Sequence, residues 1–348
     1  MTCWRMILYY LYQVRLLRMV RTAGLITLLV IFSLAAVAAG QHPQPGRDFT
    51  AVVISDLNES YGSTEYSSQV GIVLDYIASL SPDLVLCAGD MVAGQKPNLG
   101  EPCLRSMWQA FDAQILQRLQ ILQIPFAFTF GNHDGSSSSS FAHERMIARE
   151  FWGKNRPDLC YVDAVEYPDC YSFICADVFF AVIDASAARI APEHKEWLAR
   201  QLGSQTAQRA RLRVVAGHLP MYALAQGRNQ AGDVVSDADA LFDLLENNGA
   251  DYYISGHHHA FYLSRKGRVR MISAGALGGG PRKLLGSDAP ASKTVTTLHL
   301  PANGSEFKII THSVTDGLNI LNAHELPDRL NGFNGTSQLY NSAEAFEK

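Results

Sequence analysis

Apolar residues recur along the chain in two patterns, one with the short period of a strand and one with the longer period of a helix. Compact apolar runs predict buried strands at FTAVVISDLN, DLVLCAGD, PFAFTFGNHD, RLRVVAGH and DYYISGHHH. Apolar residues at helical spacing predict helices at VGIVLDYIASL, CLRSMWQAFDAQILQRLQIL, FAHERMIAREFW and ADALFDLLENNG. Because strands and helices alternate, the pattern predicts an α/β domain with a mixed sheet system and helices on its outer faces.

The second half of the chain contains a predicted hairpin and ends in strands without helices between them. Residues Tyr171 to Asp184 predict the hairpin, and Pro192 opens a helix through EHKEWLARQL. VRMISAG, TVTTLHL and FKIITHSV are β-rich, and the Asn- and Gly-rich tail after Val314 is expected to be extended or loosely docked. The predicted organisation is a leader (1–40), a linker (41–47), one large domain (48–314) and a C-terminal tail (315–348).

Composition and charge exclude several classes of protein. The chain has 348 residues and is 47% hydrophobic, which excludes a disordered or collagen-like chain. Lys and Arg number 29 against 33 Asp and Glu, and the four basic residues before position 22 have no acidic counterpart, so without them the balance is 25 minus 33, or -8. A nucleic-acid binder would carry the opposite excess, and we therefore expect no nucleic-acid-binding surface.

The N-terminal region has the pattern of an export signal. Residues 22–40 are uncharged and largely apolar, and Arg15, Arg18 and Arg21 precede them. Ala36-Val37-Ala38 supplies the small residues of a cleavage site, while the length of the run also suits a retained membrane tether. Both alternatives place the domain outside the cytoplasm, in the periplasm, in the extracellular space or anchored to a membrane. Translation can begin at Met1 or at Met19, and the sequence leaves that open.

Export to an oxidising compartment would allow some of the cysteines to form disulfides. Of six cysteines, Cys3 lies in the leader, and Cys87 lies in an apolar run, where we expect a free thiol in the core. The other four fall in polar segments and allow up to two disulfides among three pairings: Cys103, Cys160, Cys170 and Cys175.

Five apolar runs end in residues that bind metals. The endings contain Asp56, Asp90, Asn132 with His133, His218, and His257 to His259. A single Asp after a strand usually caps a turn, but ligands gather at the carboxyl ends of strands in α/β sheets. Carboxylate and amide oxygens together with imidazoles suit iron, zinc, manganese or cobalt and suit calcium poorly. Two such ions can clamp and polarise a phosphoryl group, so the set indicates a site that cleaves anionic esters.

The order of these motifs, DxN, GD, GNHD, GH and GHxH, resembles the calcineurin-like metallophosphoesterase family over Phe49 to Val314. The resemblance implies a four-layer α/β/β/α sandwich with two mixed β-sheets. It also implies a binuclear centre of divalent or trivalent transition metals (Fe, Mn or Zn) and a phosphate-ester substrate. By motif matching, Asp90 bridges the two metals, the first of which also takes Asp56 and His259 and the second Asn132, His218 and His257.

The GNHD motif supplies the expected catalytic residues. The resemblance implies that His133 stabilises or protonates the leaving oxygen. Asp134 would then orient His133, as carboxylates commonly do for catalytic imidazoles. The alternative for Asp134 is a simple turn cap.

The first motif departs from the family pattern. Members commonly have His where this chain has Asn58, and an amide oxygen is a weaker ligand for borderline metals. Asn58 is thus either a weak metal ligand or a turn residue. The segments VVAGHLPMYALAQG and SAGALGG further resemble the purple acid phosphatase branch. That branch carries a tyrosine ligand three residues after its GD aspartate, whereas this chain has Ala93, so we expect no iron-tyrosinate colour.

Two further residues fall near the predicted site. Tyr222 could bind a substrate phosphate, although packing is the commoner role for such a tyrosine. His258, between two predicted ligands, is expected to point outward toward substrate or solvent. The leading interpretation is an exported, metal-dependent phosphatase or phosphodiesterase. The alternative is a degenerate relative that binds metal or phosphate without catalysis.

Overall fold

The computed structural model describes residues 46–322 and 325–340. The predicted leader lies outside these residues, as does nearly all of the predicted linker. Within the part of the chain that is described, no helix has the length and apolar character needed to cross a membrane.

The first sheet has six strands in the order β13-β12-β11-β1-β2-β3. Its parallel half consists of β1 (Phe49–Ile54), β2 (Leu84–Cys87) and β3 (Phe126–Phe128). Its antiparallel half consists of β11 (Thr294–Leu300), β12 (Lys308–Ser313) and β13 (Asn319–Ile320). The sheet is therefore mixed, and its parallel carboxyl ends all open on one edge.

The second sheet has nine strands in the order β14-β15-β9-β10-β8-β7-β6-β5-β4. The central four strands are parallel: β6 (Val178–Val182), β7 (Leu212–Ala216), β8 (Tyr252–Ser255) and β10 (Val269–Ser273). The flanking strands are antiparallel: β4 (Cys160–Asp163), β5 (Tyr171–Cys175), β9 (Tyr262–Lys266), β14 (Arg329–Gly332) and β15 (Gly335–Leu339). The predicted hairpin is β5 and β6.

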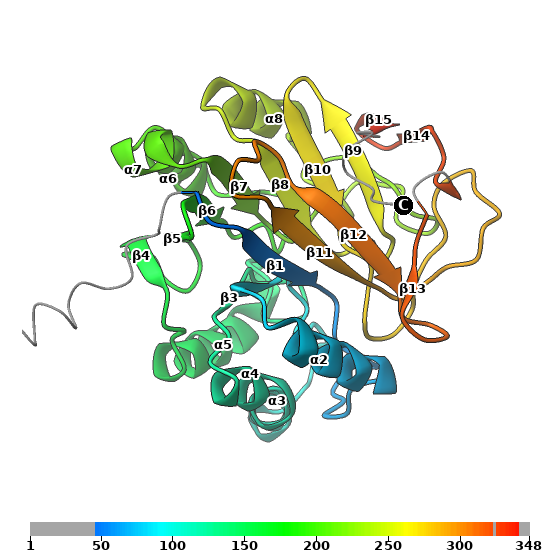
Figure 1. The fold of residues 1–348 in the computed structure, drawn as a ribbon. Helices are drawn as coiled ribbons and strands as arrows, with labels where there is room; N and C mark the ends of the chain where they lie inside the picture. The colour runs from blue at the N-terminus through cyan, green and yellow to red at the C-terminus, as the bar shows by residue number, and fades with distance from the viewer. Residues whose placement is uncertain (1–45, 323–324, 341–348) are drawn as a thin grey trace, which may run out of the picture. The chain divides into compact units, whose positions relative to one another are not determined.

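Helices cover the outer face of each sheet (Figure 1). On the first sheet lie α2 (Ser68–Leu80), α3 (Glu101–Phe111), a π-helical turn (Asp112–Leu116), α4 (Gln117–Ile121) and α5 (Ala142–Lys154), which a short 3-10 turn (Ser139–Phe141) precedes. On the second lie α6 (Pro192–Leu202), α7 (Gln205–Arg209) and α8 (Ala238–Asn247). The layers are helix, sheet, sheet and helix, which confirms the predicted four-layer sandwich.

Strand β1 shows why its sequence is apolar throughout. Val52 and Ile54 pack among the helices, whereas Ala51 and Val53 pack against the second sheet. Side chains alternate between faces along a strand, so a strand between two cores needs apolar residues at every position. The predicted core tryptophans Trp108, Trp152 and Trp197 are all buried.

The cysteines are all free within the described residues. Cys87 is completely buried, which confirms the predicted core thiol. None of the disulfides that the sequence allows is formed.

The segment after Val314 contributes to both sheets. Strand β13 pairs with β12, and β15 pairs through the backbone with β9, placing Leu339 opposite Ser264. Leu330 is buried in a cluster that includes Tyr262 of β9. The sheets therefore extend beyond the predicted domain boundary at 314.

Candidate functional site

The predicted ligands follow five parallel strands whose carboxyl ends meet between the sheets. Strands β1, β2 and β3 are neighbours in the first sheet, and β7 and β8 are neighbours in the second. The two edges approach so closely that an added Cβ on Gly256 would lie 2.0 Å from Ser55 Oγ. One on Gly89 would lie 2.5 Å from His218 Nδ1. Glycine at both positions is what allows the two sets of ligands to meet.

Four of these ligand residues adopt left-handed backbone conformations. The φ values are 51° for Asp56, 58° for Asp90, 66° for His257 and 52° for His259. Such conformations cost free energy for residues with a Cβ and are concentrated at functional sites, where surrounding structure enforces them. Here they turn the side chains sharply out of the strand direction and into the space between the sheets.

Asp56, Asp90 and His259 form the first group of potential metal donors, with ligand atoms all within 4.8 Å of one another. His259 Nε2 lies 3.2 Å from Asp56 Oδ1, and its Nδ1 donates to the carbonyl of Gly280. That bond leaves Nε2 to face the carboxylate. Burial alone would raise the pKa of Asp56, but the neighbouring His259 holds it below the usual range.

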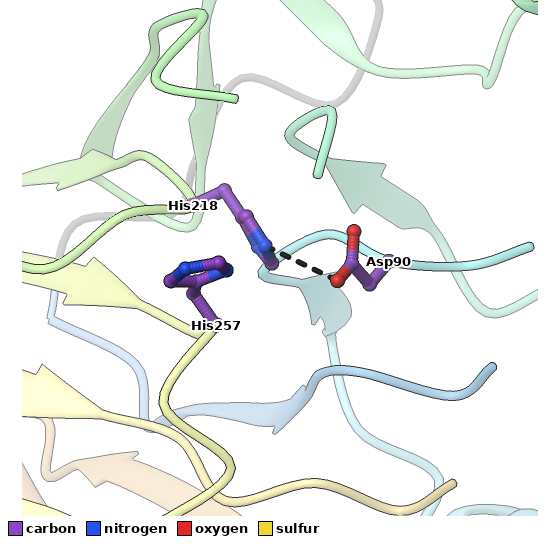
Figure 2. Close-up of side chains that lie close together, drawn as sticks. All are labelled: Asp90, His218 and His257. Carbon is purple, nitrogen blue, oxygen red and sulfur yellow. Dashed lines mark ion pairs between the residues drawn. The ribbon is translucent and has the colours of Figure 1, made fainter. Parts of the chain in front are cut away.

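Asp90, His218 and His257 form the second group, also with ligand atoms within 4.8 Å (Figure 2). His218 Nε2 lies 3.3 Å from Asp90 Oδ2 and 2.9 Å from Asn132 Oδ1, while Nδ1 donates to the carbonyl of Ala88. The Asn132 amide nitrogen donates to Gln95 Oε1, which directs Oδ1 toward His218. The predicted ligands Asn132, His218 and His257 are therefore brought together.

The two histidines of this group differ in charge. Although burial opposes protonation, the Asp90 carboxylate raises the pKa of His218 to about 9. Burial lowers the pKa of His257 to about 4, so that its ring is neutral near pH 7, the form that binds metals. Both ring nitrogens of His257 are buried without a hydrogen-bond partner.

Buried oxygen atoms without a hydrogen-bond partner indicate whether the site fits a metal ion. Asp90 Oδ2, which lies 3.3 Å from His218 Nε2, and Asn58 Oδ1 are buried and have no hydrogen-bond partner. Leaving such atoms unpaired costs free energy that a metal ion would recover. The carboxylate, amide and imidazole donors also match a borderline transition metal. The residues present fit such an ion.

Asn58 also has a backbone role. Its N–H donates to the carbonyl of Asp90 over 3.3 Å, and its own carbonyl accepts from Gly279 over 2.9 Å. These bonds hold the loop whether or not the side chain binds a metal. Its assignment as a ligand stays a prediction.

His133 lies at the opening of the site. Its ring Nδ1 donates to the carbonyl of Gly94 over 2.8 Å, and Nε2 lies 4.0 Å from Asp90 Oδ2. The side chain is 12% exposed, whereas Asp90 is buried. The exposed ring of Tyr61 lies beside it, with centroids 5.3 Å apart.

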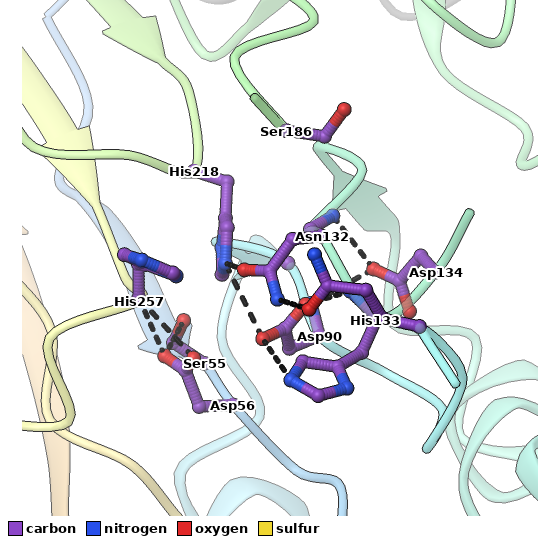
Figure 3. A network of polar contacts seen from close by, with 12 residues as sticks. Ser55, Asp56, Asp90, Asn132, His133, Asp134, Ser186, His218 and His257 are labelled. Carbon is purple, nitrogen blue, oxygen red and sulfur yellow. Dashed lines mark hydrogen bonds and ion pairs between the residues drawn. The ribbon is translucent and has the colours of Figure 1, made fainter. Parts of the chain in front are cut away.

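The Asp134 carboxylate accepts hydrogen bonds from backbone N–H groups and makes none with the His133 ring. Its two carboxylate oxygens accept four N–H groups, from Asp90, Met91, Val92 and Gly131, at 2.7–3.0 Å (Figure 3). The carbonyl of Gly94, and not Asp134, orients the imidazole. Burial, followed by the charge of Asp90, raises the pKa of Asp134 to about 7. The geometry is that of a buried cap on the loop carrying Asp90.

Of the two further residues near the site, His258 differs from the prediction and Tyr222 agrees with it. His258 is completely buried, its Nδ1 accepting from Leu224 N–H and its Nε2 donating to the carbonyl of Asp233, so the outward orientation was wrong. Alternation holds only in extended backbone, and the left-handed residues on either side of His258 break it. Tyr222 is 3% exposed, with its hydroxyl beside Lys266 and Asp239, which favours packing over phosphate binding.

Sequence reasoning missed Asp233. Its Oδ1 lies 3.9 Å from His257 Nε2 and 3.0 Å from Arg228 Nη1. Burial opposes ionisation, but these two neighbours hold the pKa of Asp233 at about 2. The residue lies in an irregular loop that has no hydrophobic period, so no pattern in the sequence marks it.

Comparisons with known proteins agree with this geometry. A family model described as calcineurin-like phosphoesterase matches residues 49–261. No curated protein sequence matches the chain.

Among solved structures, a purple acid phosphatase from yellow lupin (Lupinus luteus) seeds has 16% identity and a TM-score of 0.59, over 80% of this chain and 54% of that one. The chain thus spans about half the length of the lupin enzyme. A dimetal phosphatase from Danio rerio has 13% identity and a TM-score of 0.52, over 80% and 98% of the two chains. GAP50, the anchor in the inner membrane complex of Plasmodium, has 16% identity and a TM-score of 0.51, over 81% and 91%.

At these identities the solved structures establish the fold, and the family model covers more than half of the chain. The family implies divalent metal ions and phosphate-ester substrates. With its motifs meeting where the edges of the two sheets approach each other, the chain belongs to the calcineurin-like phosphoesterase family.

Proposed function

We propose that the chain hydrolyses phosphate esters at a centre of two metal ions. Asp56, Asp90 and His259 would hold the first ion, with Asn58 as an additional weak ligand. The second would take Asp90, Asn132, His218 and His257. The observation that carries the proposal is the Asp90 carboxylate, which belongs to both donor groups and has a buried, unpartnered oxygen.

When bound, such ions stabilise charge on phosphoryl oxygens and supply a nucleophile from water near neutral pH. The side chains of the protein would position the reacting groups and supply a proton to the leaving oxygen. Because Nδ1 of His133 is engaged by Gly94, Nε2 is the atom free to hold a proton and pass it to a leaving oxygen. Asp134 fixes the backbone on which Asp90 is carried, and therefore acts as a positioning residue in this proposal.

A fold of this kind need not be catalytic, because one similar structure is that of an anchor. Asn58 in place of the usual histidine is the feature that would fit a degenerate relative. Against it stands the preserved set of seven donor and acid residues at the strand ends: Asp56, Asp90, Asn132, His133, His218, His257 and His259. A relative that had lost catalysis would be expected to have lost several of them.

The test combines metal analysis with hydrolysis. The purified chain would be stripped of metal, reloaded with manganese, zinc or iron, and assayed in parallel on an aryl phosphate monoester and the matching diester. We expect close to two ions per chain and metal-dependent hydrolysis of at least one ester. Stoichiometric metal without hydrolysis of either ester would favour the degenerate relative, and failure to bind metal would reject the metal-dependent hydrolase.

We also propose export through residues 22–40, which lie outside the described part of the structure. The basic residues ahead of the apolar run and the small residues around Ala38 support it. Mass spectrometry of the protein from the membrane and soluble exported fractions would give its N-terminus. A terminus just after Ala38 indicates cleavage, an intact run in the membrane fraction indicates a tether, and a cytoplasmic protein with the run intact would reject export.

A further inference from the structure

Two arginines lie next to the metal-donor groups and play no part in the function proposed above. Arg282 follows β10, and its backbone N–H donates to the carbonyl of His259 over 3.0 Å. Arg228 lies in the loop after β7 and pairs with Asp233, whose Oδ1 is 3.9 Å from His257. Each arginine is thus linked to one predicted ligand, either directly through the backbone or through one carboxylate.

The Arg282 guanidinium reaches the loop at Gly227, which also carries Arg228. Arg282 Nη1 makes a long bond of 3.5 Å to the carbonyl of Gln226, and an added Cβ on Gly227 would lie 2.9 Å from the same nitrogen. Arg228 is the next residue along the chain. Burial and then the charge of Arg228 lower the pKa of Arg282, as expected for neighbouring like charges.

Among the described residues, the two arginines have one carboxylate partner between them, and some of their N–H donors have no acceptor. Asp233 pairs with Arg228, while Arg282 forms no ion pair with any residue in the described ranges. The Nε atoms of both arginines are buried and have no hydrogen-bond partner. A buried N–H donor without a partner is unfavourable, and an anion beside the two guanidinium groups would supply both an acceptor and an opposite charge.

We propose that Arg228 and Arg282 form an anion subsite that binds a second anionic group of the substrate, separate from the phosphoryl group that is hydrolysed. The inference rests on the proposed function. Guanidinium groups match phosphate and carboxylate equally well in geometry, so the ligand is a phosphate ester that carries a further phosphate or carboxylate. Arg228 is linked through Asp233 to His257 of the second donor group, and Arg282 is linked through its backbone N–H to His259 of the first, so the subsite borders the proposed metal centre.

The test compares three non-hydrolysable inhibitors against the metal-loaded enzyme, with free metal held constant by a buffer. Methylphosphonate carries one anionic group, methylenediphosphonate carries two phosphonates, and phosphonoacetate carries a phosphonate and a carboxylate. We expect the better of the two double anions to bind on the order of 10- to 100-fold more tightly than methylphosphonate. Which of them gains more identifies the second group as phosphate or carboxylate.

The variants are Arg282→Gln and Arg228→Gln, with Arg265→Gln as the matched control. Like Arg282, Arg265 donates to a backbone carbonyl, here from Nε to Gly267, but it lies on β9 and not in the loop at Gly227. The tighter binding of the double anion relative to methylphosphonate should disappear in both subsite variants and persist in the control. The affinity for methylphosphonate should be unchanged in all three variants. A gain that survives in both subsite variants, or an equal weakening of all three inhibitors, would overturn the subsite.

Arg228→Gln also breaks the pair with Asp233, so Arg282→Gln, which leaves that pair intact, decides the question if the first variant is unstable. Calorimetry measures the affinity for these inhibitors without requiring hydrolysis, and therefore tests this inference separately from the proposed function. A protein that hydrolyses no ester but still prefers a double anion keeps the subsite and loses the function. A hydrolase without the preference keeps the function and loses the subsite.

Discussion

Replacing Asp90 by Asn is the sharpest test of the metal centre, because it removes one charge and almost no volume. Asp90 is buried, and Asn tolerates its left-handed backbone better than most residues. The amide oxygen can still accept the His133 N–H that Oδ1 accepts over 2.8 Å. The fold should therefore persist, and the loss should fall on the metals.

The expected magnitude follows from the spacing of the charges. The Asp90 carboxylate lies 3.3 Å from the nearest nitrogen of His218. Unit charges at about that separation interact by about 5 kcal/mol at an effective dielectric constant of about 20, which corresponds to roughly 4 × 10³-fold in affinity. Since Asp90 belongs to both donor groups, we expect the metal concentration for half-activation to rise at least by about this factor.

The assay titrates manganese or zinc into the stripped Asp90→Asn protein and follows bound metal and ester hydrolysis together. Asp251→Asn serves as the control, because Asp251 also accepts a backbone N–H, that of Arg213, but lies away from the site. The control should match the unaltered protein. Unchanged metal content and full activity in Asp90→Asn would refute the reasoning.

The remaining predictions concern individual residues of the site. If Asn58 is a weak ligand, Asn58→His should tighten metal binding and Asn58→Ala should loosen it, whereas unchanged activation midpoints in both would leave it a turn residue. His133→Ala should lower turnover on the order of 10²-fold or more at unchanged metal content, and an equal loss of metal would instead make His133 a ligand. Because the Tyr61 ring is exposed beside His133, Tyr61→Ala should raise KM for aryl more than for alkyl phosphates, which steady-state kinetics on a matched pair would check. In the metal-stripped protein Asp90 raises the pKa of His218 to about 9, so metal binding near pH 8 should release a proton, measurable by calorimetry in buffers of different ionisation enthalpy. The same raised pKa means that the ion pair of His218 and Asp90 stabilises the metal-stripped protein fully below about pH 6.5. Its contribution is lost as the pH rises through about 9. If the stability of the unaltered protein did not fall over this range relative to that of Asp90→Asn, the assignment would be contradicted.

The sequence by itself determined the architecture and most of the candidate metal-donor residues. Apolar runs such as that of β1 are buried on both faces, so their hydrophobicity directly encodes a strand between two cores. Asp90 and His218 could be predicted as site residues because each directly follows such a run. A strand fixes where its end lies, and a polar residue placed there faces the open edge of the sheet.

Only the tertiary structure decided how the loops complete the site. His258 turns inward because its two neighbours are left-handed, which no period in the sequence records. Asp134 caps backbone because its carboxylate meets four N–H groups on two converging loops. Asp233 and Arg282 reach the ligands from irregular segments distant in sequence, and such contacts depend on loop packing and not on hydrophobic pattern.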